Sequence, residues 1–279
     1  MRFPISIIVP VYNEEKRLEK GISRILNFCQ QQNWNFEVII VEDGSTDRTV
    51  EIVKQFCLRD KRIKLISLSY RCGKGGSILH AIKHCSRDNI GYLDIDLSTD
   101  PSEFKRLIPY IKEFDVVVGS RLKRGGLKPI QRPFMRSMLS KLYSSYFSTL
   151  FNVGILDSQC GFKIFKRKSI LPIVSTIQTN GFAFDSEFIV NSSLFGLRIK
   201  EVPIEWHHEM GSKLNVHRAI FMMSFDLQKI WINTIQLQLI SNNSIQTCSV
   251  VKPVILYKIV KKMVTVVSET RSNIAIFGH

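Results

Sequence analysis

The first 120 residues alternate short apolar runs with amphipathic segments, and no other feature of the sequence limits the fold so strongly. Buried strands are predicted by five apolar runs, at residues 6–11, 36–41, 63–68, 90–93 and 116–118. A helix between the first two runs is predicted by apolar residues at helical spacing, namely Leu18, Ile22, Ile25, Leu26 and Cys29. Strands and helices that alternate in this way indicate crossover units, so we expect an α/β fold with a mostly parallel central sheet flanked by helices.

Local signals predict where several helices begin. Ser45 or Thr46 is expected to cap the helix after the second strand, because a side-chain oxygen there can accept from the first free N–H groups. Asp100 followed by Pro101 predicts another helix start. A further helix is predicted over residues 77–84.

The second half of the chain predicts more helices and fewer strands. Helices are expected after Pro133, at 186–194 and at 216–240, and strands at 162–165 and 199–204. The tail near 251–267 predicts a basic amphipathic helix. We therefore expect one domain over residues 1–215 and a C-terminal region of amphipathic helices over 216–279.

Composition and charge narrow the class of protein. With 279 residues and 44% hydrophobic content, the chain is expected to be globular. The six cysteines form no C-x-x-C pair and are interpreted as reduced thiols of a cytosolic protein, and no apolar run is long enough to predict a spanning helix. The net charge of +15 suits an anionic membrane surface, a phosphorylated substrate or nucleic acid. Basic and aromatic residues are not interleaved, so nucleic acid is not an expected partner.

Polar residues follow the predicted strands, where ligands bind in parallel sheets. Asp94 and Asp96 close the fourth strand, and side chains two apart on a strand point the same way. Two such carboxylates can hold a hard divalent cation, Mg²⁺ or Mn²⁺, that keeps positions open for phosphate. The alternative interpretation is a solvated acidic turn.

Two further loops have the composition of a nucleotide site. Glu42-Asp43-Gly44-Ser45 closes the second strand, and an acidic side chain there can accept from a nucleobase or ribose; the alternative is a helix cap. The glycine-rich turn 71–76 resembles a phosphate cradle that includes Lys74, although it lacks the P-loop pattern. Its alternative is a flexible basic loop.

A basic stretch begins where the fifth strand ends. Residues 121–156 contain no Asp or Glu, and their basic side chains are Arg121, Lys123, Arg124, Lys128, Arg132, Arg136 and Lys141. A solvated face is the ordinary interpretation of such a run. The stretch begins beside the predicted cation site, however, and this favours an acceptor substrate that carries a phosphate. Arginine can bind a phosphate through two parallel N–H···O hydrogen bonds.

These motifs belong to eight longer strings, which are IIVPVYNEE, VIIVEDGSTD, RCGKGGS, YLDIDLSTDP, VVGSR, DSQCGFKIF, GFAFDSEFI and PIEWHHEMGSKL. Together and in order, the strings resemble the inverting family 2 glycosyltransferases with a GT-A fold. The most similar group is the dolichyl-phosphate glucosyltransferases with their prokaryotic polyprenyl-phosphate relatives, and dolichyl-phosphate mannose synthases are less similar. The resemblance spans residues 4–215 and implies that they form a GT-A catalytic domain.

The resemblance implies roles on the donor side. The base and ribose pocket would be lined by Pro10, Tyr12, Glu14, Val41 and Asp43. Asp94 and Asp96 would bind Mg²⁺ or Mn²⁺ and through it the diphosphate, and Lys74 is also assigned to the nucleotide-sugar. Lys213 would reach the leaving diphosphate.

The resemblance also implies roles on the acceptor and sugar sides. The acceptor phosphate would be held by Arg121, Arg132, Arg136 and Ser140. The sugar side would be lined by Asp157, Gln159 and Asp185. Catalysis is accordingly expected to depend on Asp96, Arg121, Asp185 and Lys213.

The implied reaction transfers glucose from UDP-glucose to dolichyl or polyprenyl phosphate. GDP-mannose as donor and a saccharide hydroxyl as acceptor stay open, and Asp185 could serve as a base for a hydroxyl. A phosphate oxygen is already anionic and needs no strong base. The C-terminal helices are expected either at a membrane interface or packed on the catalytic domain or a partner chain. We expect a cytoplasmic protein, peripheral on the cytosolic face of a membrane.

Overall fold

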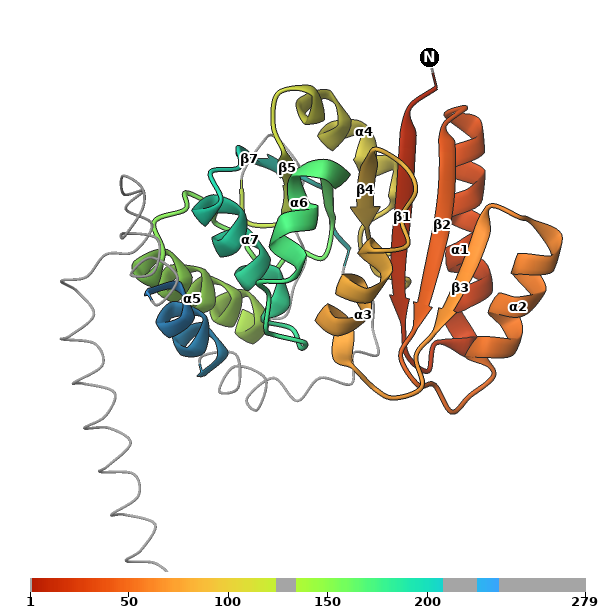
Figure 1. Ribbon diagram of the computed structural model, residues 1–279, viewed down its shortest axis with the longest axis horizontal. Helices are drawn as coiled ribbons and strands as arrows, with labels where there is room; N and C mark the ends of the chain where they lie inside the picture. Colours follow the sequence, from red (N-terminus) through yellow and green to blue (C-terminus); the bar gives the residue numbers. More distant parts are fainter. Residues whose placement is uncertain (1, 124–133, 208–224, 236–279) are drawn as a thin grey trace, which may run out of the picture.

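The computed structural model describes residues 2–123, 134–207 and 225–235. Within these residues, seven strands form one sheet in the order β3-β2-β1-β4-β6-β5-β7 (Figure 1). The strands are β1 (Pro4–Val11), β2 (Asn35–Glu42), β3 (Ile63–Ser67), β4 (Asn89–Tyr92), β5 (Val116–Ser120), β6 (Lys163–Lys166) and β7 (Ile199–Pro203).

The sheet is mostly parallel, as the alternation of strands and helices predicts. β1 pairs in parallel with β2 and β4, β2 with β3, and β5 with β7. The exception is β6, which lies between β4 and β5 and is antiparallel to both. The sequence predicts this strand at 162–165 but carries no local signal for its direction.

Helices cover both faces of the sheet (Figure 1). They are α1 (Glu15–Gln31), α2 (Thr49–Arg59), α3 (Gly73–Ile82), α4 (Phe104–Leu107), α5 (Phe134–Leu150), α6 (Arg167–Val174) and α7 (Phe184–Leu194), with 3-10 turns η1 (Pro101–Glu103) and η2 (Ile108–Lys112). Helix α1 packs against α2, and α3 contacts α6 and α7.

Burial explains why the central strands and the first helix form here. The side chains of Ile5, Ile7, Ile8 and Val9 on β1 are fully buried, as expected for a central strand covered on both faces. The apolar stripe predicted for α1 is confirmed, because all five of its residues lie in the core: Leu18, Ile22, Ile25, Leu26 and Cys29.

Two predicted helix starts are wrong. Helix α3 begins at Gly73 rather than Ser77, because the Asp43 carboxylate accepts the N–H groups that precede the predicted start. Neither Ser45 nor Thr46 caps α2, which begins at Thr49; Asp47 Oδ1 accepts the Thr49 N–H at 2.9 Å instead. The start at Asp100 is confirmed, since its Oδ1 accepts the Ser102 N–H at 2.9 Å, although the element is the short turn η1.

The described part of the predicted C-terminal helix 216–240 is helical over 225–235 and is drawn in blue in Figure 1. Leu227 and Ile230 are buried in the hydrophobic core, and Asn233 donates to Gln178 Oε1 at 2.9 Å. This segment therefore packs on the α/β domain. The expected boundary near residue 215 and the tail 251–267 lie outside the described residues. In the part of the chain that the structure describes, no helix combines the length and apolarity needed to cross a bilayer.

Candidate active site

The predicted site residues follow strands whose carboxyl ends point the same way (Figure 1). Val11 at the end of β1 is in register with Glu42 at the end of β2, and Ile8 with Tyr92 at the end of β4. The three loops that start there therefore meet at the carboxyl ends of the central strands. They carry Tyr12 and Glu14, Asp43, and Asp94 and Asp96.

Side-chain hydrogen bonds join the first two of these loops. Asn13, held at a φ of 53°, accepts the Thr46 N–H on its Oδ1 at 2.8 Å and donates its own N–H to Ser45 Oγ at 3.0 Å. The Glu14 N–H donates to Thr49 Oγ1 at 2.9 Å. Ser45 thus fixes the loop after β1 rather than capping α2.

Asp43 is buried and holds the glycine-rich turn. Its carboxylate accepts the N–H of Cys72 at 2.5 Å and the N–H of Gly73 at 2.8 Å. Gly73 has a φ of +82°, a backbone conformation that favours glycine. The structure thus gives Asp43 a capping contact, at the N-terminus of α3 rather than α2.

The next two N–H groups of the turn are also occupied. Gly75 and Gly76 both donate to the carbonyl oxygen of Asn180, at 2.8 and 3.2 Å. A Cβ at Gly75 would collide with Phe184 of α7. With four N–H groups already paired to the protein, the turn does not offer a backbone phosphate cradle of the predicted kind, and Lys74 is left to reach a ligand through its side chain.

Lys74 forms an ion pair with the first carboxylate of the predicted cation site. Its Nζ lies 2.7 Å from Asp94 Oδ1, and the Asp94 side chain is 43% exposed. Burial opposes protonation, but the carboxylates of Asp94, Asp185 and Asp96 outweigh it and raise the pKa of Lys74. Burial raises the pKa of Asp94, Lys74 acts against this, and Asp96 and Asp185 reinforce it.

Asp96 and Gly161 complete the surroundings of this pair. Asp96 Oδ1 accepts the Ser98 N–H at 2.9 Å, which orients the carboxylate. A Cβ at Gly161 would lie 2.5 Å from Asp94 Oδ2, so only glycine keeps this space free. Among the described residues there is no cluster of three or more His, Cys, Asp or Glu that could hold a metal. Two carboxylates beside a space that a Cβ would fill fit a hard cation whose other ligands come from solvent or a phosphate.

Asp185, predicted on the sugar side, is buried at the start of α7. Its Oδ1 accepts hydrogen bonds from Tyr92 Oη and Lys163 Nζ. Lys163 is fully buried and also donates to the carbonyl oxygens of Cys160 at 2.6 Å and Ser158 at 3.2 Å. The Asp185 charge is thus balanced by a buried ammonium group.

Arg121 and Asp157 are bound to each other. Arg121 Nε and Nη2 donate to the two oxygens of Asp157, both at 2.8 Å, and the Arg121 N–H adds a third bond of 2.8 Å. Burial opposes the shift, but Asp157 raises the pKa of Arg121. Glu201 of β7 accepts the Asp157 N–H at 2.8 Å and so fixes the loop that contains Asp157 to the sheet. The predicted acceptor-side arginine and sugar-side aspartate therefore form one unit.

Gln159 belongs to a network of neutral hydrogen-bonding groups. Its Nε2 donates to Tyr143 Oη at 2.9 Å, to Ser186 Oγ at 3.1 Å and to the carbonyl of Phe182 at 3.1 Å. Tyr143 lies on α5 and Ser186 on α7, so Gln159 connects both helices to the loop that precedes β6. Burial raises the pKa of Tyr143.

The other predicted residues fall into two groups. Val41 is buried, Pro10, Glu14 and Ser140 are half-buried, and the Tyr12 ring has the Arg71 guanidinium 3.9 Å from its centroid. Arg132 and Lys213 lie outside the described residues, as does the side chain of Arg136, whose backbone is in α5.

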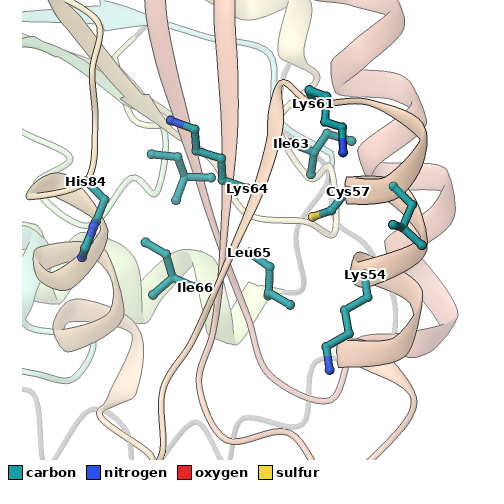
Figure 2. A pocket seen from close by; sticks show the side chains of 10 residues that line it. Lys54, Cys57, Lys61, Ile63, Lys64, Leu65, Ile66 and His84 are labelled. Atoms are coloured by element: carbon teal, nitrogen blue, oxygen red, sulfur yellow. The ribbon is translucent and has the colours of Figure 1, made fainter.

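A hollow of about 790 Å³ lies elsewhere, along the edge strand β3 (Figure 2). Lys54 and Cys57 of α2, Lys64 of β3 and His84 are among the side chains that line it. It contains none of the predicted site residues. The site at the strand ends is therefore supported by its side chains and not by this cavity.

Four residues that hold the site together were not predicted from the sequence: Tyr92, Tyr143, Lys163 and Asn180. A charged residue inside the apolar string GFKIF is an available signal for Lys163, because a lysine in a buried strand needs an acidic partner. Asn180 acts through its backbone carbonyl, which leaves no trace in the sequence.

Comparison with known proteins identifies the family of the chain. The chain matches the Glycosyl transferase family 2 over residues 6–171. Dolichyl-phosphate beta-glucosyltransferase ALG5A of Trichomonas vaginalis is 33% identical over 241 residues, which cover 81% of this chain and 72% of that protein. Glycosyltransferase AglD of Haloferax volcanii is 28% identical over 231 residues, and this chain spans 37% of its length.

A solved structure supports the fold. Glucosyl-3-phosphoglycerate synthase from Mycobacterium tuberculosis, in complex with Mn²⁺, UDP-glucose and phosphoglyceric acid, has a TM-score of 0.60 at 18% identity, covering 84% of this chain and 79% of that one. The mostly parallel seven-stranded sheet flanked by helices, together with this likeness and the family match, shows an α/β fold of the GT-A type. The chain belongs to glycosyl transferase family 2 and is a glycosyltransferase.

Proposed function

We propose that this glycosyltransferase moves glucose from UDP-glucose to dolichyl or polyprenyl phosphate, with inversion and with the help of Mg²⁺ or Mn²⁺. The main support is the Asp94–Asp96 pair at the end of β4, with Lys74 2.7 Å from Asp94. Relatives named dolichyl-phosphate beta-glucosyltransferase favour this donor sugar and acceptor over GDP-mannose and mannosyl transfer.

The donor would lie across the loops after β1, β2 and β4. Tyr12, Glu14 and Asp43 would face the base and ribose, and Asp94 and Asp96 would hold the cation. A bound divalent cation would neutralise the negative charge that grows on the departing diphosphate. Lys74, and Lys213, which follows β7 in the sequence, would add their own positive charge to the same phosphates.

The state of Asp185 favours a phosphate acceptor over a sugar hydroxyl. The residue is buried and its Oδ1 already accepts hydrogen bonds from Lys163 and Tyr92, so this oxygen is occupied and is not available to take a proton from a hydroxyl. A phosphate oxygen attacks without losing a proton, so the protein needs only to orient acceptor and donor. Arg121, Arg132, Arg136 and Ser140 would seat that phosphate.

An acceptor with an isoprenoid tail requires contact with a bilayer. The helix over 225–235 buries Leu227 and Ile230 but leaves Phe225 44% and Ile232 48% exposed. The helix that carries these apolar side chains lies beside α5 (Figure 1), to which Gln228 donates at Tyr146 Oη, and the net charge of +15 suits an anionic leaflet. Peripheral binding to the cytosolic face of a membrane is therefore part of the proposal.

The test is transfer by the purified full chain in detergent with polyprenyl phosphate. UDP-glucose with Mn²⁺ or Mg²⁺ is expected to give a product whose glycosidic configuration is inverted, and chelation by EDTA is expected to stop the reaction. Faster transfer from GDP-mannose would reassign the donor. Faster transfer to an alkyl glucoside than to the lipid phosphate would reassign the acceptor.

A further inference from the structure

Lys74 places a positive charge where the cation would bind. Its Nζ lies 2.7 Å from Asp94 Oδ1, one of the two carboxylates of the cation site. A divalent ion bound to the same carboxylate would lie close to the ammonium group, and two cations at such a separation repel each other strongly in a partly buried site. The contact with Lys74 and the contact with the ion therefore oppose each other.

The surroundings hold Lys74 in this position. The Cys72 and Gly73 N–H groups are bound to Asp43 and those of Gly75 and Gly76 to Asn180, so the backbone on both sides of Lys74 is fixed. A Cβ at Gly161 would lie 2.7 Å from Lys74 Nζ, so the ammonium group rests against the Gly161 backbone. The Lys74 side chain is 19% exposed, so it is mostly enclosed while it contacts Asp94.

We propose that Lys74 is an internal counter-ion that occupies Asp94 until a divalent cation and a diphosphate bind together. The cation takes over Asp94, and the diphosphate offers Lys74 new acceptor oxygens in place of the lost carboxylate. Lys74 thereby couples the two ligands: it weakens cation binding to the free protein and loses this effect once diphosphate is present. This inference rests on the proposed function, because it assumes that Asp94 and Asp96 hold the ion.

The first test is Mn²⁺ binding measured by electron paramagnetic resonance, with and without UDP, which needs no turnover. Lys74→Met is expected to tighten Mn²⁺ binding to the free protein by about tenfold, and UDP is expected to add less further affinity than in the wild type. Lys74→Arg, which keeps the charge, is expected to stay within about twofold of the wild type. Lys54→Met, an exposed change on α2, is the control for loss of one positive charge.

The outcomes separate this inference from the proposed function. Equal Mn²⁺ affinities for wild type and Lys74→Met would overturn the counter-ion role and leave the metal site standing. Absence of Mn²⁺ binding in every variant, with or without UDP, would overturn the metal-dependent function and this inference with it.

A second measurement uses the unaltered chain and does not depend on the folding of a variant. Brief labelling with an amine-reactive reagent, read by mass spectrometry, is expected to modify Lys74 faster when Mn²⁺ is present alone, and more slowly again with Mn²⁺ and UDP together. Exposed Lys54 and buried Lys163 are internal references for fast and slow labelling. Unchanged labelling of Lys74 on addition of Mn²⁺ would overturn the proposal.

Discussion

Lys163 of β6 and Asp185 of α7 form an ion pair in which the side chains are 0% and 4% exposed. Two sequence motifs, DSQCGFKIF and GFAFDSEFI, therefore meet in the core through one charge–charge contact. Tyr92 at the end of β4 donates to the same oxygen of Asp185. The contact joins β4, which carries the proposed cation site at its end, to β6 and α7 in the second half of the chain.

Loss of Lys163 is expected to be costly. Lys163→Met leaves Asp185 as a buried charge without its cation, so the free energy of unfolding should fall by about 3–5 kcal/mol. Urea denaturation measures this change. Arg48→Met is the matched control: it breaks the exposed Arg48–Glu51 pair, with side chains 72% and 69% exposed, and should cost less than about 1 kcal/mol. Equal losses would contradict a special role for the buried pair.

Asp96→Ala is expected to abolish transfer and the response to Mn²⁺ while leaving the fold intact. The rate should fall at least about 10³-fold, because the lost charge stabilisation is worth several kcal/mol. Steady-state kinetics and thermal melting measure the two effects. Asp88→Ala removes an exposed carboxylate just before β4, at the end away from the site, and should leave the rate unchanged. Normal turnover of Asp96→Ala would remove Asp96 from the site.

Arg136→Ala should raise the KM for lipid phosphate by about tenfold or more and change the KM for UDP-glucose much less, because the guanidinium is assigned to the acceptor phosphate. Separate titrations of the two substrates measure this difference. Lys141→Ala removes an exposed charge from the same helix and is the control. Similar changes in both KM values would place Arg136 outside the acceptor site.

Stability at low pH should depend on Glu37. Burial alone would raise its pKa, but hydrogen bonds from Lys64, Ser6 and Ser86 outweigh this and lower it to about 2. A carboxyl group with a lowered folded-state pKa contributes stability above its unfolded pKa, and that stability is lost as the pH falls from about 4.5 toward 2. Its full contribution should be about 3 kcal/mol.

Glu37→Gln is expected to destabilise the protein near neutral pH and to flatten this acid-dependent loss. Unfolding free energies measured from neutral pH down to about pH 3 give the comparison. Glu51→Gln, an exposed change, is the control and should leave the pH profile as in the wild type. A Glu37→Gln profile as steep as that of the wild type would assign the acid sensitivity to another group.

Gly75→Ala should destabilise the chain by about 1–3 kcal/mol, because the new methyl group collides with Phe184. Gly181→Ala is the matched control in the facing loop, where a Cβ meets nothing within 4 Å, and it should stay within about 0.5 kcal/mol of the wild type. Thermal or urea unfolding distinguishes the two. A neutral Gly75→Ala would show that α3 and α7 can move apart.

Local patterns were sufficient for much of the fold. The five apolar runs and the stripe on α1 depend on periodicity, which burial imposes directly on neighbouring residues, and β1, β2 and α1 form where they predict. The starts of α2 and α3 were not predicted correctly. The start of α3 depends on the contact between Asp43 and Gly73, which are far apart in the chain. At α2, the predicted cap Ser45 is bound to Asn13 of the loop after β1, and Asp47 accepts the Thr49 N–H in its place.

In the candidate site, too, residues marked by local sequence were predicted and residues that depend on distant partners were not. Residue type and position after a strand indicated Asp94, Asp96 and Asp43, because the end of a parallel strand is a place fixed by topology. Other parts of the site depend on partners from distant segments. Lys163 neutralises Asp185, and the Asn180 carbonyl holds the glycine-rich turn. A single sequence contains no record of which distant side chain supplies a counter-charge.

The reversed strand β6 has a consequence for the order of folding. Tyr92 in β4 is paired with Lys163 in β6, which is synthesised 71 residues later. Until β6 is made, β4 is an open edge whose backbone groups have no partner on that side, a state prone to pairing with other chains. Such distant pairing also slows folding. The segment from β1 to β4 is therefore synthesised well before the strand that covers the open side of β4, and the edge of β4 stays exposed during this interval.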